Sequence, residues 1–134
     1  MNTLISRIKE HEGFVNVVYK DSLGFDTIGF GTKMPLTRSE AEMILESRLN
    51  NMVEELKMKE PFFKLLPDEA KDVISEMAYQ MGVNGVLKFK KMWIAMKLGN
   101  YKKAATEMLD STWHTQTPYR AEKLANIMEQ VQWQ

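Results

Sequence analysis

A long run of helical spacing that starts at Thr37 divides the chain into two stretches of different character. Thr37-Arg38-Ser39-Glu40 has the spacing of a capping box, in which the threonine hydroxyl and the glutamate carboxylate each satisfy a free backbone N–H. Apolar residues then recur along one helix face, at Ala41, Ile44, Leu45, Leu49, Met52, Val53 and Leu56. The pattern predicts a connecting helix over residues 37–57.

The segment before this helix begins with a shorter helix. Leu4, Ile5 and Ile8 share one face of a helix over residues 3–12, and Gly13 suits the left-handed residue that commonly ends one. The segment therefore starts with an amphipathic helix whose last residue is Glu12.

The next residues predict a small β region. Residues 14–20 are rich in valine and include a tyrosine, which favours a strand, whereas residues 21–24 are typical of a turn. Residues 25–30 can return as a second strand, and Pro35 ends the region. We expect a β-hairpin lobe over residues 13–36.

The remainder of the chain is helical in pattern. Pro61 and Pro67 mark breaks, Asp68 is in place to cap the next helix, and the pair Thr117-Pro118 is typical of a helix start. Further helical spacing covers residues 68–81, 89–98, 101–109 and 118–131.

These elements predict an α+β fold that is mainly helical. A small β-hairpin N-terminal lobe would be joined by the long helix to a larger helical C-terminal lobe. We expect residues 1–134 to form one domain, in which residues 58–134 build the helical lobe together with residues 1–12.

Composition excludes several classes of function. Lysine and arginine balance aspartate and glutamate at 18 each, and this neutrality argues against nucleic acid as a partner. There is no cysteine and no apolar run long enough to span a bilayer, so we expect no thiolate metal site and no membrane insertion. Charged residues from Lys9 to Glu12 interrupt any signal-peptide core, which predicts a product made in the cytoplasm. We also expect a monomer.

Two carboxylates stand out as candidate catalytic groups. Glu12 ends the first helix and Asp21 opens the hairpin turn. Glycoside hydrolysis typically needs one acid to protonate the leaving oxygen and one carboxylate to activate water or attack the sugar. The alternative for each residue is structural: a solvated helix-end glutamate, and a turn aspartate that bonds its own backbone.

The residues around this pair form a recognisable pattern. In order along the chain stand Glu12-Gly13, Tyr19-Lys20-Asp21, Gly24 and Thr27-Ile28-Gly29-Phe30-Gly31. This series resembles the active-site signature of the phage lysozyme family, the endolysins of T-even phages and their relatives. Residues 77–82 and 111–121 resemble two later blocks of the same family, so the likeness covers most of the chain.

The resemblance implies an N-acetylmuramidase, which hydrolyses the β-1,4 bond between N-acetylmuramic acid and N-acetylglucosamine in bacterial peptidoglycan. It implies that Glu12 is the general acid, that Asp21 positions or activates water, and that Thr27 orients this water on an inverting pathway. The two carboxyl groups of an inverting pair stand about 6.5–9.5 Å apart. No cofactor and no metal are expected, and a holin-like pore would release the enzyme to the wall.

The same resemblance implies further site residues. Gln80, Phe89 and Gln116 would bind substrate, while Arg120 would stand near Glu12 and position it, and Gly29 would support the site. Trp113 is expected in the core, because a large aromatic residue at a helix junction usually packs.

Two departures from the family pattern concern the first lobe. Thr32 stands where the family usually has a histidine after its Gly-x-Gly, and only residues 32–37 separate Gly31 from the long helix. Relatives carry a longer segment there, with another strand and a small helix. We expect a trimmed lobe, a shallower cleft wall and fewer sugar subsites.

Two other functions fit the same fold. A non-catalytic peptidoglycan-binding or structural protein would bind wall without releasing reducing ends. A related glycosidase, such as a transglycosylase or a chitosan-cleaving enzyme, would release a different product. Asp21 and Thr27 favour hydrolysis, because the pair prepares a water.

Overall fold

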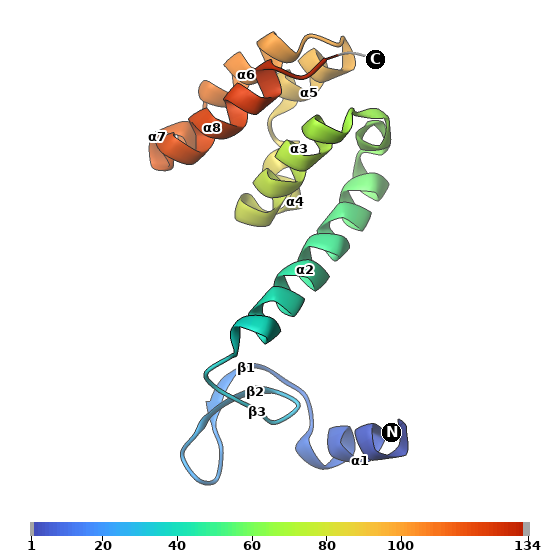
Figure 1. Ribbon diagram of the computed structural model, residues 1–134, viewed down its shortest axis with the longest axis vertical. Coiled ribbons are helices and arrows are strands. Elements are labelled where there is room, and N and C mark those ends of the chain that lie inside the picture. The colour runs from blue at the N-terminus through green and yellow to red at the C-terminus, as the bar shows by residue number, and fades with distance from the viewer. Residues whose placement is uncertain (1, 133–134) are drawn as a thin grey trace. The chain divides into compact units, whose positions relative to one another are not determined.

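The computed structural model describes residues 2–132 and divides the chain into two compact units, the first ending at Ile44 and the second starting at Leu45. The elements are α1 (Asn2–Glu12), β1 (Val15–Lys20), β2 (Asp26–Gly29), β3 (Thr32–Lys33), α2 (Arg38–Lys59), a 3₁₀ helix (Pro61–Leu65), α3 (Asp68–Met81), α4 (Val83–Leu87), α5 (Lys90–Lys97), α6 (Tyr101–Leu109), α7 (Thr112–Gln116) and α8 (Pro118–Glu129). Figure 1 labels all of them except the 3₁₀ helix. The α+β, mainly helical fold is confirmed.

The first unit contains α1 and a three-stranded antiparallel sheet with the order β1-β2-β3. The hairpin prediction is confirmed for β1 and β2, but the two-residue β3 was not expected. Gly29 and Gly31 both have φ of +71°, which lets the chain reverse sharply after β2 and return alongside it. The segment after Gly31 therefore keeps a minimal third strand.

The long helix α2 begins where the sequence predicted. The backbone N–H of Glu40 donates to Thr37 Oγ1 at 3.1 Å, and the N–H of Thr37 donates to Glu40 Oε1 at 2.8 Å. These two bonds are the reciprocal contacts of a capping box. The hydrogen bond from the backbone N–H of Thr37 is the largest cause that holds the pKa of Glu40 below its usual value.

The second unit is entirely helical in the part that the structure describes. The predicted helices after Pro67 are present, while the short helices α4 and α7 were missed because each has only five residues. Asp68 was predicted to cap α3, but Pro67 occupies the cap position. Asp68 instead lies in the first turn, where its negative charge suits the N-terminal end of the helix dipole.

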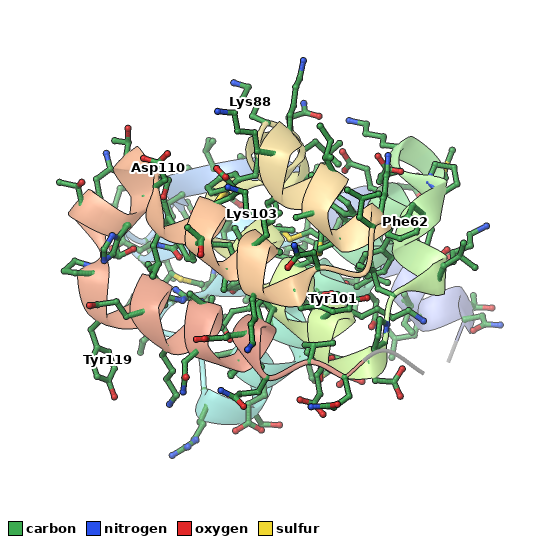
Figure 2. The ribbon with its side chains drawn as sticks, turned by 90° about the horizontal axis from the view of Figure 1, so that it is seen from above. Phe62, Lys88, Tyr101, Lys103, Asp110 and Tyr119 are labelled. Atoms are coloured by element: carbon green, nitrogen blue, oxygen red, sulfur yellow. The ribbon has the colours of Figure 1, made fainter. Side chains whose placement is uncertain are left out.

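The hydrophobic core belongs to the second unit. Every buried hydrophobic residue of the described chain lies between Leu56 and Val131, and methionines fill much of the interior. Within this unit α6 packs against α5 and α8, and α3 packs against α4 and α8. Tyr101 lies in the core at the start of α6, whereas Tyr119 on α8 projects outward (Figure 2).

Among residues 2–132, no helix has both the length and the apolar character that crossing a bilayer requires.

Candidate functional site

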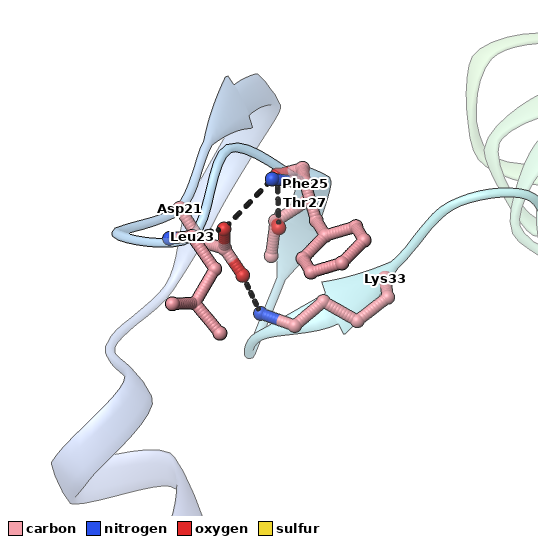
Figure 3. A network of polar contacts seen from close by, with 5 residues as sticks. All are labelled: Asp21, Leu23, Phe25, Thr27 and Lys33. Atoms are coloured by element: carbon pink, nitrogen blue, oxygen red, sulfur yellow. Dashed lines mark hydrogen bonds and ion pairs between the residues drawn. The ribbon is translucent and has the colours of Figure 1, made fainter.

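Asp21 is held in place by the backbone of its own turn. Its Oδ1 accepts the backbone N–H of Leu23 at 2.9 Å and that of Phe25 at 2.8 Å (Figure 3). The backbone N–H of Asp21 donates to the Phe25 carbonyl at 2.9 Å, which closes the turn. The structural alternative raised by the sequence is therefore present, and it also fixes the direction of the carboxylate.

The second oxygen of this carboxylate faces a lysine that the sequence analysis did not single out. Lys33 Nζ lies 2.5 Å from Asp21 Oδ2. The hydrogen bond from Lys33 is the largest cause that holds the pKa of Asp21 below its usual 3.8, followed by the N–H of Phe25. The stabilisation from the ionised Asp21 is thus present above its unfolded pKa and is lost as the pH falls through the lowered pKa.

Thr27 lies at the centre of the sheet and its side chain is completely buried. Its hydroxyl donates to the Phe25 carbonyl at 2.8 Å. Thr27 pairs with Tyr19 on one side and with Lys33 on the other. The residue ties the centre of the sheet to the turn that holds Asp21.

Glu12 reaches the turn between β2 and β3. It ends α1, where Gly13 has φ of +68° and its N–H donates to the Lys9 carbonyl at 2.9 Å. The carboxylate lies over Gly31, because a Cβ built on that glycine would fall 2.2 Å from Glu12 Oε2. The absence of a side chain at Gly31 thus makes room for the Glu12 carboxylate.

The first unit therefore brings Glu12, Asp21 and Thr27 together around one small sheet. Lys33 links the two carboxylates electrostatically, since both Asp21 and, more weakly, Glu12 raise its pKa. Lys33 could have been found from the sequence by pairing β3 with β2, but a two-residue strand gives no periodic signal.

Gln80 and Trp113 form a polar contact within the second unit. The indole N–H of Trp113 donates to Gln80 Oε1 at 2.9 Å, and Gln80 Nε2 donates to Thr117 Oγ1 at 3.4 Å. Trp113 is only 7% exposed, so the expectation that it packs in the core is confirmed. Gln80 therefore has a structural role, because it accepts the hydrogen bond of the Trp113 indole N–H.

Replacing Gln80 with leucine is expected to lower the free energy of unfolding by about 1–3 kcal/mol, because the buried indole N–H loses its acceptor. The matched control is Gln116→Leu on the exposed end of α7, which should change stability by no more than about 0.5 kcal/mol. Urea unfolding followed by tryptophan fluorescence measures both. Equal losses in the two variants would contradict the role given to the Gln80–Trp113 bond.

Phe89 lines an open pocket of about 550 Å³ in the second unit, between the start of α5 and the end of α6. Its ring meets Trp113 edge-on, with centroids 6.0 Å apart, and Lys88, Lys90 and Lys91 also line the pocket. Gln116 is exposed on α7 and is not among the lining residues. The structure thus places Phe89 at a surface that a ligand can enter.

Arg120 is paired within the second unit. Its Nε donates to Glu76 Oε2 at 2.8 Å, which joins α8 to α3. The pairing of Arg120 with Glu12 stays a prediction. Across residues 2–132, no three histidine, aspartate or glutamate side chains are grouped so that they could hold a metal ion.

Comparison with known proteins gives a consistent result. Residues 9–129 match the model of the phage lysozyme family. The probable T4-type lysozymes 1 and 2 of Dictyostelium discoideum are 29% and 27% identical, each over 96% of this chain and 95% of their own length. The pre-baseplate central spike protein Gp5 of Enterobacteria phage T4 is 28% identical over 94% of this chain, which corresponds to 27% of that protein.

The alignments also bear on the length of the chain. The alignment with the first Dictyostelium discoideum protein runs over 161 positions, whereas this chain has 134 residues. That relative therefore carries residues that this chain lacks, and the shortening of the first lobe stays a prediction.

Proposed function

The chain belongs to the phage lysozyme family, and from this premise we propose that it hydrolyses the β-1,4 bond between N-acetylmuramic acid and N-acetylglucosamine in bacterial peptidoglycan. Family membership makes it a lysozyme-type glycoside hydrolase. The observation that carries the finer proposal is the arrangement of the first unit, in which Glu12 lies over Gly31 and a fixed Asp21 lies on the same small sheet.

Glu12 is proposed as the general acid that protonates the leaving sugar oxygen. The side chain is exposed at the end of α1, so a sugar chain has access to it. The close approach of its carboxylate to Gly31 favours one placement, which a proton donor needs if it is to meet a bound glycosidic oxygen.

Asp21 is proposed as the carboxylate that activates the attacking water in an inverting reaction. Its lowered pKa keeps it ionised at neutral pH, which suits a group that accepts a proton. Thr27 supports this role by bonding the Phe25 carbonyl, and Phe25 in turn donates to Asp21. For Thr27 to orient the water directly, its buried hydroxyl would have to become accessible.

The remaining site residues are proposed from the family resemblance. Phe89 is supported by its pocket, and Gln116 by its exposure. Gln80 would contact substrate in addition to holding Trp113, and Arg120 would position Glu12. Gly29 would support the site through its positive φ, which lets β2 end in the turn that carries Gly31.

Lysis of the host cell is the proposed biological outcome. The wall lies outside the inner membrane, so the route that we propose is release through a holin-like pore.

The unmodified chain tests the proposal when it is added to Gram-negative cells with a permeabilised outer membrane. We expect the turbidity to fall and muropeptides with reducing N-acetylmuramic acid ends to appear. Anhydro-sugar products would identify a transglycosylase instead. Binding to purified wall without any released sugar, by protein shown to be folded, would identify the non-catalytic alternative.

A further inference from the structure

We propose that Lys33 is a positioning residue of the active site, which holds the Asp21 carboxylate in its charged form and in one orientation toward the attacking water. The inference rests on the proposed function, because that function gives Asp21 its water. It adds a residue that lies on β3, in the short segment between Gly31 and α2.

The register of the sheet explains why Lys33 reaches Asp21. Thr27 pairs with both Tyr19 and Lys33, and paired residues in antiparallel strands place their side chains on the same face. Asp21 follows Tyr19 by two residues, which returns its side chain toward that face. A shift of β3 by one residue would turn Lys33 to the opposite face.

The hydrogen bonds of Asp21 show what the lysine leaves free. An ionised carboxylate offers about four acceptor sites, two on each oxygen. The N–H groups of Leu23 and Phe25 fill the two sites on Oδ1, and Lys33 takes one on Oδ2. One acceptor site remains on Oδ2, and Lys33 determines which of the two sites that is, because it occupies the other. A water that donates a hydrogen bond there would be placed by Lys33 through Asp21.

The charges around this pair are few. Lys33 is the charged group that lowers the pKa of Asp21. Glu12 and Tyr19 raise the pKa of Lys33 by charge interactions that are weaker than that of Asp21. Lys20 lies at the end of β1, and its Nζ pairs with Asp26 Oδ1 at 2.6 Å. Lys20→Met is therefore a matched control, since it removes a lysine ion pair from the same sheet and leaves the one to Asp21.

Exposure separates a positioning role from a structural one. The side chain of Lys33 is 51% exposed and that of Asp21 is 13% exposed, so water screens the lysine end of the ion pair and limits its contribution to folding stability. Replacing Lys33 should therefore lower the free energy of unfolding only by the amount that the raised pKa of Asp21 accounts for, while it changes the titration of Asp21. Salt screens exposed charges, so added salt should act on the unmodified chain in the same direction as the substitution.

The first measurement is a titration of the aspartate carboxyl carbons by NMR, in the unmodified chain and in three variants. Lys33→Met should move the Asp21 titration to higher pH, because it removes the largest cause of the lowered pKa. Lys33→Arg should restore the lower value, since arginine keeps the charge and the donors. Lys20→Met should leave Asp21 where it is. An Asp21 titration that is the same in all four proteins would overturn the inference.

The second measurement is the pH profile of kcat/KM for sugar release. Loss of Lys33 should move the acidic limb to higher pH and lower kcat more than it changes KM, with rescue by Lys33→Arg. An acidic limb that stays in place although the Asp21 titration has moved would also overturn the positioning role. If the unmodified chain releases no sugar, the proposed function fails, and the NMR titration still decides whether Lys33 controls Asp21.

A variant that fails to fold would not remove the test. The unmodified chain can then be titrated from low to high sodium chloride, where we expect the Asp21 titration to move upward as the ion pair is screened. An Asp21 titration that does not respond to salt would contradict the inference.

Discussion

Glu12→Gln is expected to reduce the release of reducing sugar ends about 10²–10⁴-fold, the range typical for loss of a positioned general acid. Glutamine keeps the size and polarity of the side chain but has no proton that it can donate to a leaving oxygen. Because Glu12 is exposed at the end of α1, the substitution should not change the free energy of unfolding by more than about 0.5 kcal/mol. Kinetics on purified peptidoglycan and urea unfolding measure the two effects.

The same helix supplies a matched control for this variant. Glu10 is exposed on α1, two residues before Glu12, and Glu10→Gln removes an equal charge close to the same site. We expect Glu10→Gln to keep nearly full activity. Equal losses from both variants would indicate a general charge effect, and retained activity in Glu12→Gln would assign the proton donor to another residue.

Gly31→Ala is expected to remove most of the activity without unfolding the protein. The new methyl group would fall 2.2 Å from Glu12 Oε2, so the carboxylate must leave its place over the turn. The Glu12 carboxylate is the end of a flexible, exposed side chain, so it can move at little cost to stability. Misplacing a catalytic group by about 1 Å can lower the rate about 10²-fold. The initial rate of sugar release measures the loss.

Gly29→Ala separates this effect from backbone strain. Gly29 and Gly31 have the same φ of +71°, so alanine at either position costs about 1–2 kcal/mol as a left-handed residue. A Cβ at Gly29 meets no atom within 4 Å. The two variants should therefore unfold at similar denaturant concentrations. Gly31→Ala should be much less active than Gly29→Ala. Equal activity would show that the contact between Gly31 and Glu12 has no catalytic consequence.

The part of the fold that the sequence predicted is the part that depends on periodic apolar spacing and capping. The apolar stripe after Thr37 and the reciprocal bonds of Thr37 and Glu40 specify α2 locally, so its start followed from composition and spacing. The five-residue helices α4 and α7 do not complete enough turns to show a periodic pattern, and their positions depend on packing.

The candidate site was predicted only in part for a similar reason. Glu12 and Asp21 carry a pattern that extends over neighbouring residues, whereas Lys33 acquires its position only when β3 pairs with β2. The hydroxyl of Thr27 donates to the Phe25 carbonyl, a partner that becomes available only when the turn has formed. Long-range register and hydroxyl partners are properties of the folded chain that residue types alone do not determine.

Among the described residues before Leu56, no hydrophobic residue is buried, and this has a consequence for how heat inactivates the protein. Three short strands and one helix bury too little apolar surface to form an independently stable unit. The segment that carries Glu12 and Asp21 should therefore open as a separate cooperative unit, at a lower free energy than the helices built on the methionine-rich core. Amide hydrogens of β1 and β2 would exchange with solvent sooner than those of α3 and α8, and enzymatic function would disappear while most of the helical circular dichroism remained.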